Sequence, residues 1–477
     1  MINSNLRCVA ALFAALLAGL SGSAEPSKAK PINLLIITAD DMNADSWFNS
    51  KVGATPHLDA FAKSSYRFEQ MHVSAPICQP SRSALMTGRV PHRNGALGFN
   101  PINLDVPTLT EVCSSNGYFT AALNKVSHMA PASKFKWDLA LDGSGKNPER
   151  LQTDFAKCLS AARDVGKPFF INANITDPHR PFAGSRGGKD EEEEPAGKKR
   201  LKKNEANSTS VPIYKTNEII VPEFLEDIPD VRSEVALYFS SVRRLDMSFT
   251  GLMAALEASG EKENTVIFFM SDHGMSFPYA KATIYRNGTW SPLLVKFPGM
   301  KKPFVNTTDM ISSVDVMPTA LELMNVPKPS GMDGRSLVSL LEGEKQQGRD
   351  HVFTHVNTVS SGKSFPGRCV RTKTKAYIWN EWPDGTKRYK VEAMGGMSFN
   401  ALAAAAEKDP RIKERVQNYL FRTPEEFYDE QKDPSERRNL IKDPACQKDI
   451  QAFKKLLLAE MEKTNDPLLE KFRAVCK

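Results

Sequence analysis

The run Asn33-Leu34-Leu35-Ile36-Ile37-Thr38, which leads to Asp40-Asp41, decides the fold of this 477-residue chain. It is continuously apolar, which is typical of a strand buried on both faces of a parallel sheet. Three more runs of this kind follow, separated by helix-like stretches. Their sequence positions and the polar residues after them are 119–123 before Asn124-Lys125, 169–174 before Asp177-Pro178-His179, and 265–270 before Ser271-Asp272-His273.

This pattern predicts an α/β fold with a large, mostly parallel sheet flanked by helices. In open α/β sheets the ligand site lies beyond the carboxyl ends of the strands. We therefore expect the four polar strand ends to converge on one site. Residues 231–256 have apolar side chains at steps of three and four, which predicts a helix that covers the sheet. Thr55-Pro56 predicts a helix start with proline in the first turn.

A change in the pattern of apolar residues along the chain predicts two folded parts. Residues 30–345 form the catalytic α/β domain, and 184–210 form an exposed, charged, glycine-containing insertion within it. From about His351 the runs become shorter and alternate, as in Ala376-Tyr377-Ile378-Trp379. We interpret 346–477 as a smaller C-terminal α+β subdomain.

The N-terminus has the pattern of an export signal at residues 1–24. Arg7 precedes an apolar segment that ends near Leu20, and Gly22-Ser23-Ala24 offers small residues for cleavage near Ala24. The apolar segment is shorter than the roughly 20 residues of a membrane-spanning helix. The sequence thus predicts export to a periplasmic, extracellular or lysosome-like compartment, without stable membrane insertion.

Charge and cysteine content exclude other classes. The net charge is +7, and the acidic block 190–194 is offset by a basic block at 198–203. No sustained basic face is visible, so nucleic acid is not an expected partner. Without Cys8 and Cys78, five cysteines remain at irregular spacings, which excludes a disulfide scaffold and leaves room for one bridge in the C-terminal part.

A second stretch carries the chemistry: Cys78-Gln79-Pro80-Ser81-Arg82, continued by Ser83 through Thr87-Gly88-Arg89. It resembles the signature of the type I sulfatases, in which the cysteine of C-x-P-S-R is oxidised to formylglycine. The resemblance runs from about residue 32 to 440 and includes Phe427-Tyr428-Asp429. It implies an alkaline-phosphatase-like sulfatase fold and a formylglycine-generating enzyme as a maturation partner. The alternative is an unmodified buried cysteine at a helix start.

In this family the hydrated aldehyde carries two hydroxyls. One attacks sulfur, and the other later expels sulfate as the carbonyl forms again. Serine or unmodified cysteine could perform only the first of these steps.

Asp40-Asp41 and Asp272-His273 form a cluster of metal ligands at two strand ends. Carboxylate oxygens suit a divalent cation of the calcium type. The resemblance assigns Asp40, Asp41, Asp272, His273 and the modified Cys78 to one Ca²⁺. Many relatives have asparagine at the position of His273, which bears on metal preference. Asp272 is also the expected acceptor of the nucleophile's proton.

The resemblance gives the remaining site residues their roles. Arg82, one helical turn past Cys78, steadies the nucleophile. Lys125 holds sulfate oxygens, and His128 accepts the proton from the second hydroxyl. His179 lies near the leaving group, and Lys281 is a second sulfate-binding lysine. For His128 the alternative is a structural histidine, and for Lys281 a solvated lysine.

The motifs Asp177-Pro178-His179-Arg180 and Pro91-His92-Arg93-Asn94-Gly95 look most like the N-sulfoglucosamine sulfohydrolase (heparan sulfamidase) branch of the family. We therefore expect hydrolysis of a sulfate ester or sulfamate on a sulfated saccharide. Two alternatives stay open: a phosphomonoesterase or phosphodiesterase of the related fold, and a non-enzymatic sulfated-glycan-binding relative whose Cys78 is never converted.

We place substrate specificity in the 184–210 insertion and around His355, Arg368 and Arg371.

Overall fold

The computed structural model describes residues 30–48, 51–185 and 211–477. The expected export signal and almost all of the expected insertion lie outside these residues. The described chain from Ile32 onward forms one compact unit that contains three sheets.

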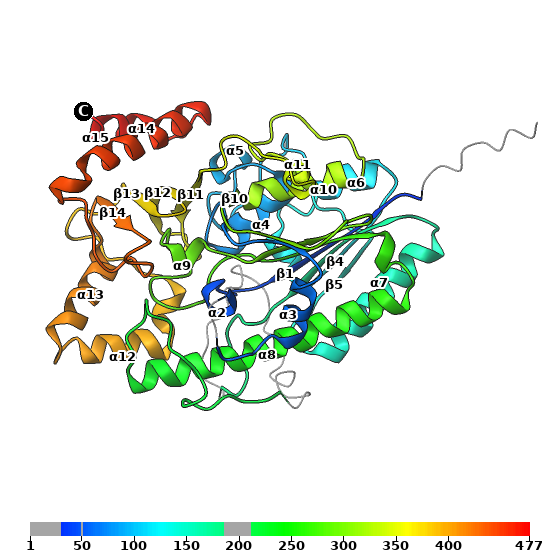
Figure 1. Cartoon of the computed structure of the whole chain (residues 1–477), viewed down its shortest axis with the longest axis horizontal. Helices are drawn as coiled ribbons and strands as arrows, with labels where there is room; N and C mark the ends of the chain where they lie inside the picture. The colour runs from blue at the N-terminus through cyan, green and yellow to red at the C-terminus, as the bar shows by residue number, and fades with distance from the viewer. Residues whose placement is uncertain (1–29, 49–50, 186–210) are drawn as a thin grey trace, which may run out of the picture. The chain divides into compact units, whose positions relative to one another are not determined.

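An eight-stranded sheet positions the site (Figure 1). Its strand order is β5-β4-β6-β1-β7-β8-β2-β9, and the central strands β4, β6, β1 and β7 are all parallel. β8 is antiparallel to both β7 and β2. The strands are β1 (Asn33–Ala39), β2 (Tyr66–Phe68), β4 (Phe119–Leu123), β5 (Leu139–Leu141), β6 (Phe169–Ile175), β7 (Thr265–Ser271), β8 (Leu293–Lys296) and β9 (Phe304–Asn306).

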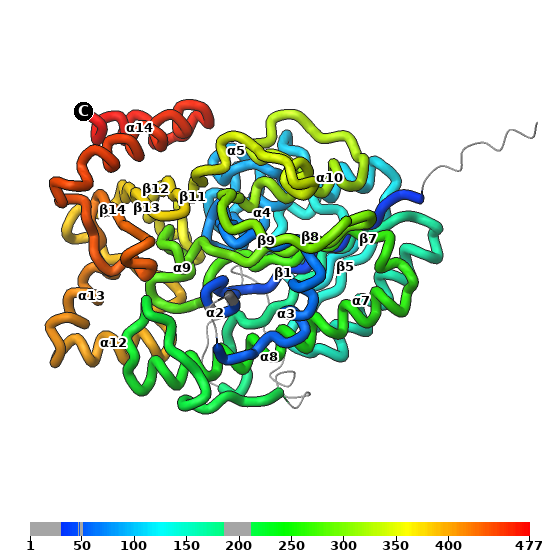
Figure 2. Tube along the Cα trace, in the orientation of Figure 1, coloured from blue at the N-terminus to red at the C-terminus, as the bar shows by residue number. Residues whose placement is uncertain are grey.

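The apolar runs are continuous because both faces of the sheet are covered. Leu35 and Ile37 of β1 belong to one hydrophobic core, whereas Leu34 and Ile36 belong to a second core on the opposite face. Figure 2 shows β1, in blue, next to β7, which comes from the middle of the chain. The predicted parallel sheet and its four buried strands are confirmed.

Helices cover both faces of this sheet (Figure 1). The first core includes residues of α3 (Pro56–Ala62), α7 (Pro148–Asp164) and α8 (Pro229–Ala258). The second core, on the opposite face, includes residues of four other helices. These are α4 (Cys78–Thr87), α6 (Leu109–Ser115), α10 (Val316–Leu323) and α11 (Val338–Leu341). The helix expected over 231–256 and the helix start at Pro56 are confirmed.

The remaining short elements lie in the connections. They are α2 (Asp45–Phe48), β3 (Met71–His72), α5 (Pro91–Asn94), η1 (Val126–His128), η2 (Lys262–Asn264), α9 (Arg286–Thr289), β10 (Ile311–Ser312) and η3 (Ser313–Asp315). β3 and β10 pair in a separate two-stranded sheet.

The C-terminal part is an antiparallel four-stranded sheet with helices around it. The sheet begins at His351, and Ala376-Tyr377-Ile378-Trp379 lies in its third strand. The strands in order are β11 (His351–Thr358), β12 (Ser364–Thr372), β13 (Lys375–Asn380) and β14 (Glu425–Asp429). The helices are η4 (Glu392–Gly395), α12 (Met397–Ala405), α13 (Pro410–Phe421), η5 (Pro444–Cys446), α14 (Gln447–Lys463) and α15 (Leu469–Val475).

Arg368 and Arg371, expected near the substrate, have structural partners instead. Both are fully buried on β12. Arg368 donates two hydrogen bonds to Asp466, at 2.6 and 3.0 Å. Arg371 pairs with Glu430 and Glu436. The two arginines thus lie buried on β12 and not in loops that face the substrate, because charged strand residues at buried positions need acidic partners from the same subdomain.

Replacing Asp466 by asparagine is expected to lower the free energy of unfolding by about 3 kcal/mol, because it leaves the buried guanidinium of Arg368 without its countercharge. Despite burial, the hydrogen bonds from Arg368 lower the pKa of Asp466 to about 2. This stabilisation is therefore present above the ordinary pKa of 3.8 and is lost as pH falls toward 2. Denaturant unfolding would measure it. Glu462→Gln, which breaks an exposed pair with Arg473, is the control and should change stability by less than about 1 kcal/mol.

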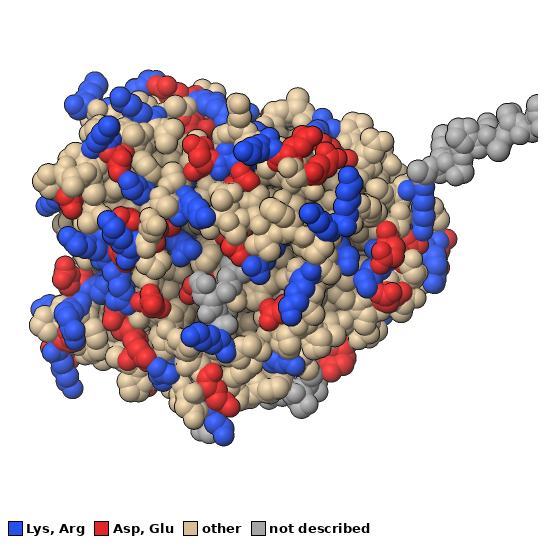
Figure 3. Space-filling model, viewed as in Figure 1, with Lys and Arg blue, Asp and Glu red and all other residues tan. Residues whose placement is uncertain are grey.

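The surface charge, the helix hydropathy and the state of the cysteines can be compared with the sequence expectations. Lys and Arg are interspersed with Asp and Glu over the face shown in Figure 3. Among the described residues, no helix is long and apolar enough to cross a membrane. The six described cysteines are free thiols, so the one bridge for which the sequence left room is not formed among them.

Candidate active site

Polar residues at the ends of the parallel strands meet in one place. β1 pairs with β6 up to Ala39–Ile175 and with β7 up to Ala39–Ser271. The backbone continues this alignment beyond the strands, since Asp40 N–H donates to Asp177 O and Asp272 N–H donates to Ala39 O. The expected convergence is thus explained by the register of the sheet.

Cys78 is the first residue of α4 and is completely buried. Its Sγ lies 3.1 Å from His273 Nε2 and 3.8 Å from Asp40 Oδ1. The helix N-terminus is fixed to the strand end, because Ser81 Oγ donates to Asp272 O at 2.5 Å. The start of α4 therefore aims the side chain of residue 78 at the acidic end of β1.

Asp40, Asp41, Cys78 and His273 form a compact ligand set. One potential ligand atom of each lies within 4.8 Å of the others, and all four residues are buried. Asp41 has φ +68°, a left-handed conformation that turns the chain sharply directly after β1. Buried carboxylate oxygens with one histidine fit a divalent cation. Burial, together with Asp40 and Glu392, raises the pKa of Asp41 well above its ordinary value despite Lys281, so a cation would relieve a real electrostatic cost.

Two cations hold Asp40. Lys125 Nζ lies 2.6 Å from Asp40 Oδ2, and Arg82 lies 3.8 Å from the same oxygen. Burial alone would raise the pKa of Asp40, but Lys125, His179 and Arg82 outweigh it and hold the pKa well below its usual range. The backbone of Lys125 itself is in the left-handed region, at φ +51°, and the residue follows β4 and Asn124 directly.

Asp272 lies beside the compact set and is engaged by the protein. Its Oδ2 accepts from Arg82 at 2.9 Å, and its Oδ1 accepts from the backbone N–H of Asp41 at 3.1 Å. Its Oδ2 is also 3.8 Å from His273 Nε2. The carboxylate thus joins the ligand set to the arginine that faces the nucleophile.

Lys281 and His179 lie together on another side of the site. Lys281 Nζ is 3.2 Å from Asp41 Oδ1 and is buried, which is incompatible with the alternative of a solvated lysine. His179 Nδ1 donates to Arg180 O at 2.7 Å, which leaves Nε2 to face the site. Burial, followed by Lys281 and Lys125, lowers the pKa of His179 well below its ordinary value.

His128 is buried on η1, one turn past Lys125, with its ring against the edge of Phe99. Within the described part of the chain, neither of its ring nitrogens has a hydrogen-bond partner. Burial, Lys125 and Arg82 lower its pKa well below the ordinary value, so the ring is neutral near pH 7. A neutral buried imidazole with uncommitted nitrogens is suited to accept a proton.

Two site residues were missed by the sequence analysis. Asn174 of β6 accepts a hydrogen bond from Arg82, and Glu392 of η4 lies 2.8 Å from Lys281 Nζ. Asn174 ends one of the four predicted runs, so its position was a usable signal. Glu392 comes from the C-terminal subdomain, in a stretch without a motif, and nothing in the sequence pointed to it.

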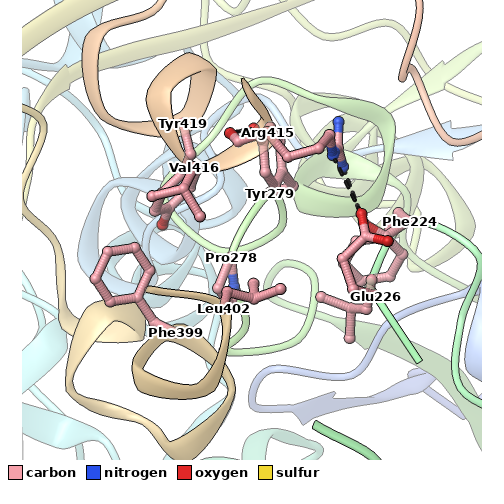
Figure 4. Close-up of a pocket in the computed structure, with 10 residues that line it drawn as sticks. Phe224, Glu226, Pro278, Tyr279, Phe399, Leu402, Arg415, Val416 and Tyr419 are labelled. Atoms are coloured by element: carbon pink, nitrogen blue, oxygen red, sulfur yellow. Dashed lines mark hydrogen bonds and ion pairs between the residues drawn. The ribbon is translucent and has the colours of Figure 1, made fainter. Parts of the chain in front are cut away.

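Pro278 and Tyr279, which precede Lys281 in the sequence, line a pocket rich in aromatic side chains (Figure 4). Tyr279 donates its hydroxyl to the backbone carbonyl of Arg415, whose guanidinium lies 3.8 Å from the centre of the Tyr279 ring. Arg415 in turn lies 3.7 Å from Glu226. Helix α13 of the C-terminal part therefore holds Tyr279, which lies two residues before Lys281 in the sequence.

Comparison with known proteins agrees with this geometry. A family model described as Sulfatase matches residues 32–326, and one described as N-sulphoglucosamine sulphohydrolase, C-terminal, matches residues 272–381. The N-sulphoglucosamine sulphohydrolase of Homo sapiens is 28% identical, over 92% of this chain and 92% of that protein.

Solved structures share the fold at lower identity. A 2-O GAG sulfatase superposes with a TM-score of 0.67 at 21% identity, over 92% of this chain and 93% of that one. A phosphonate monoester hydrolase from Silicibacter pomeroyi gives 0.65 at 17% identity, over 92% and 96%. The fold alone is thus shared by hydrolases of sulfate esters and of phosphonate esters. The sulfatase family model, in contrast, matches more than half of the chain. This chain therefore belongs to the sulfatase family and is a hydrolase of sulfate esters.

Proposed function

We propose that this protein is an exported enzyme that hydrolyses a sulfate ester or sulfamate on a sulfated saccharide of the glycosaminoglycan type. The nucleophile is a formylglycine derived from Cys78, and the bound ion is a divalent cation of the calcium type. The observation that carries the proposal is the place of Cys78: it begins α4 where β1 and β7 end, beside Asp40 and His273 and among buried cations.

The substrate class is supported by two relatives. One is named as an N-sulphoglucosamine sulphohydrolase and the other as a 2-O GAG sulfatase. The first aligns with 92% of this chain, and the C-terminal family model matches residues 272–381. Export is supported by the pattern of residues 1–24.

The ion site fits the proposed cation. Asp40, Asp41, Asp272 and His273 would hold it together with residue 78, and the bound ion would supply a Lewis acid beside the nucleophile. The hydrated aldehyde at position 78 would supply the attacking hydroxyl. We assign the other steps to side chains around Cys78 and the end of β1.

Charge stabilisation comes from buried cations. Lys125 and Lys281 flank the acidic end of β1 from two sides, each within 3.3 Å of a carboxylate oxygen. We propose that they bind the sulfate oxygens and offset the charge that develops during the transfer. Arg82 keeps Asp272 and residue 78 in register at the start of α4.

Proton transfers fall to three groups. Asp272 is proposed to take the proton of the attacking hydroxyl, because its Oδ2 lies 3.8 Å from His273 Nε2, which in turn lies 3.1 Å from Cys78 Sγ. His179 Nε2 is proposed to give a proton to the leaving oxygen or nitrogen. His128, neutral and buried, is proposed to accept the proton of the second hydroxyl when sulfate departs.

The proposal predicts two coupled results for protein made together with a formylglycine-generating enzyme. The peptide that contains residue 78 should be about 18 Da lighter than the cysteine form, as expected for thiol-to-aldehyde conversion. The same preparation should release sulfate from defined heparin saccharides faster than phosphate from matched phosphate esters. Mass spectrometry and ion chromatography would measure both.

Faster phosphate release would favour the phosphoesterase alternative. An active enzyme with an intact thiol at Cys78 would contradict the nucleophile. Binding of sulfated glycan without conversion or turnover would favour the non-enzymatic alternative.

A further inference from the structure

Glu392 is an acidic residue in the cation-lined side of the site, and the C-terminal subdomain supplies it. Its Oε2 lies 2.8 Å from Lys281 Nζ, and its Oε1 lies 3.8 Å from His179 Nε2. Both oxygens are buried, and the side chain is only 10% exposed. A site that binds a sulfate group gains nothing directly from a carboxylate, so this residue needs another explanation.

The segment around Glu392 is rigidly fixed next to His179. Glu234 of α8 accepts hydrogen bonds from the backbone N–H groups of Met397 and Ser398, and it also pairs with Arg180. A side chain at Gly396 would collide with that pair, since an added Cβ would lie 2.5 Å from Arg180 and 2.8 Å from Glu234. A Cβ between η4 and α12 would therefore displace the ends of these two paired side chains.

Electrostatic repulsion explains why the carboxylate of Glu392 lies between Lys281 and His179. Lys281 and a protonated His179 would repel each other in a buried site. A carboxylate in contact with Lys281 and facing His179 Nε2 offsets that repulsion and fixes both groups in one geometry. Asp41 cannot do this alone, because it contacts Lys281 and belongs to the ligand set.

We propose that Glu392 is a positioning residue that holds His179 and Lys281 against the leaving atom of the substrate. The proposal rests on the proposed function and extends it to the C-terminal subdomain. Glu392 takes no part in bond making itself; it acts through His179 and Lys281.

The reaction step that depends on this arrangement is the departure of the sugar. The bond between sulfur and the leaving oxygen or nitrogen breaks, and both electrons pass to the leaving atom while the oxygen at residue 78 bonds to sulfur. The leaving atom takes the Nε2 proton of a His179 imidazolium, and the ring becomes neutral with its Nδ1–H still on Arg180 O. The carboxylate of Glu392, which faces Nε2, favours this charged form against the effect of burial. Lys281 keeps its proton and its positive charge throughout this step.

The test uses Glu392→Gln in fully converted, metal-loaded enzyme, with two kinds of substrate. A saccharide sulfate has a poor leaving group that needs the proton, whereas a nitrophenyl sulfate has a good leaving group that does not. We expect kcat on the saccharide to fall about 100-fold, within the range for loss of general-acid catalysis. On the nitrophenyl sulfate, kcat should fall less than about threefold.

Glu392→Asp keeps the charge and should restore most of the saccharide activity. Glu381→Gln, which breaks a pair with Lys471 in the same subdomain, is the matched control and should leave both activities unchanged. An equal loss on both substrates would mean a merely structural role and would overturn the inference while sulfatase function stands. Absence of sulfate release by the converted wild-type enzyme would instead overturn the proposed function.

Discussion

Cys78→Ala is expected to reduce sulfate release by about 10⁴-fold or more, because it removes the atom from which the nucleophile is made. The loss should come with little change in stability. The thiol is completely buried, but removing one sulfur atom costs on the order of 1 kcal/mol. Initial rates with a saccharide sulfate and thermal unfolding of the same samples would separate the two effects.

Cys78→Ser makes the test sharper. A serine hydroxyl could take sulfate from the substrate but has no second hydroxyl with which to expel it. We expect at most one sulfate transferred per chain, visible as a single mass increase on the peptide that begins α4. Cys113→Ala is the matched control, since Cys113 is equally buried but packs in the second hydrophobic core. Full turnover by the serine variant would contradict the proposed chemistry.

The central sheet could be predicted because its sequence signal is local. β1, β4 and β7 have mainly apolar interiors, and β6 departs from this pattern at Asn172 and Asn174. The covering helices on both faces explain why the strands are mainly apolar on both sides. Because parallel strands end at the same edge, the run ends also predicted the site at Asp40, Lys125 and Asp272. Periodicity and chain direction were sufficient for this step.

The residues that come from the C-terminal subdomain could not be predicted in the same way. Glu392 reaches Lys281 across 111 residues of sequence, through contacts of Glu234 with the start of α12. Arg368 and Arg371 illustrate the opposite error. Their location in the C-terminal part suggested specificity loops, but both are buried on a strand and paired with acids far along the chain, at 430, 436 and 466. Both outcomes depend on long-range packing that no local pattern encodes.

The metal ligand set was predicted from residue type, and its electrostatics appear only in three dimensions. Asp40 and Asp41 are neighbours in sequence, yet the pKa of Asp40 is lowered and that of Asp41 is raised. Burial acts on both, but Lys125 and Arg82 contact Asp40, whereas Asp41 faces Asp40 and Glu392 with Lys281 as its cation. Among the candidate ligands, Asp41 is therefore the one whose charge would depend most on a bound ion.

Asp41→Asn is accordingly expected to weaken binding of the divalent cation by at least about 100-fold, since changes to outer contacts of metal ligands already cost 10- to 100-fold. Asparagine tolerates the φ of +68° and keeps one oxygen at this position, so the turn after β1 should survive. At limiting Ca²⁺ the variant should lose sulfatase activity, and added Ca²⁺ should restore part of it. Calcium titration followed by activity and by thermal unfolding would measure the shift.

Chelation separates the metal from the fold. A chelator should lower both the activity and the unfolding temperature of the wild-type protein, because an ion that binds only the folded state stabilises it by mass action. It should have little effect on Asp41→Asn, which binds the ion weakly from the start. Asp154→Asn, an acid paired with Lys157 on α7, is the control and should keep wild-type calcium affinity. If Asp41→Asn bound calcium as tightly as the wild type, Asp41 would not be a metal ligand. Its role would then be limited to the ion pair with Lys281.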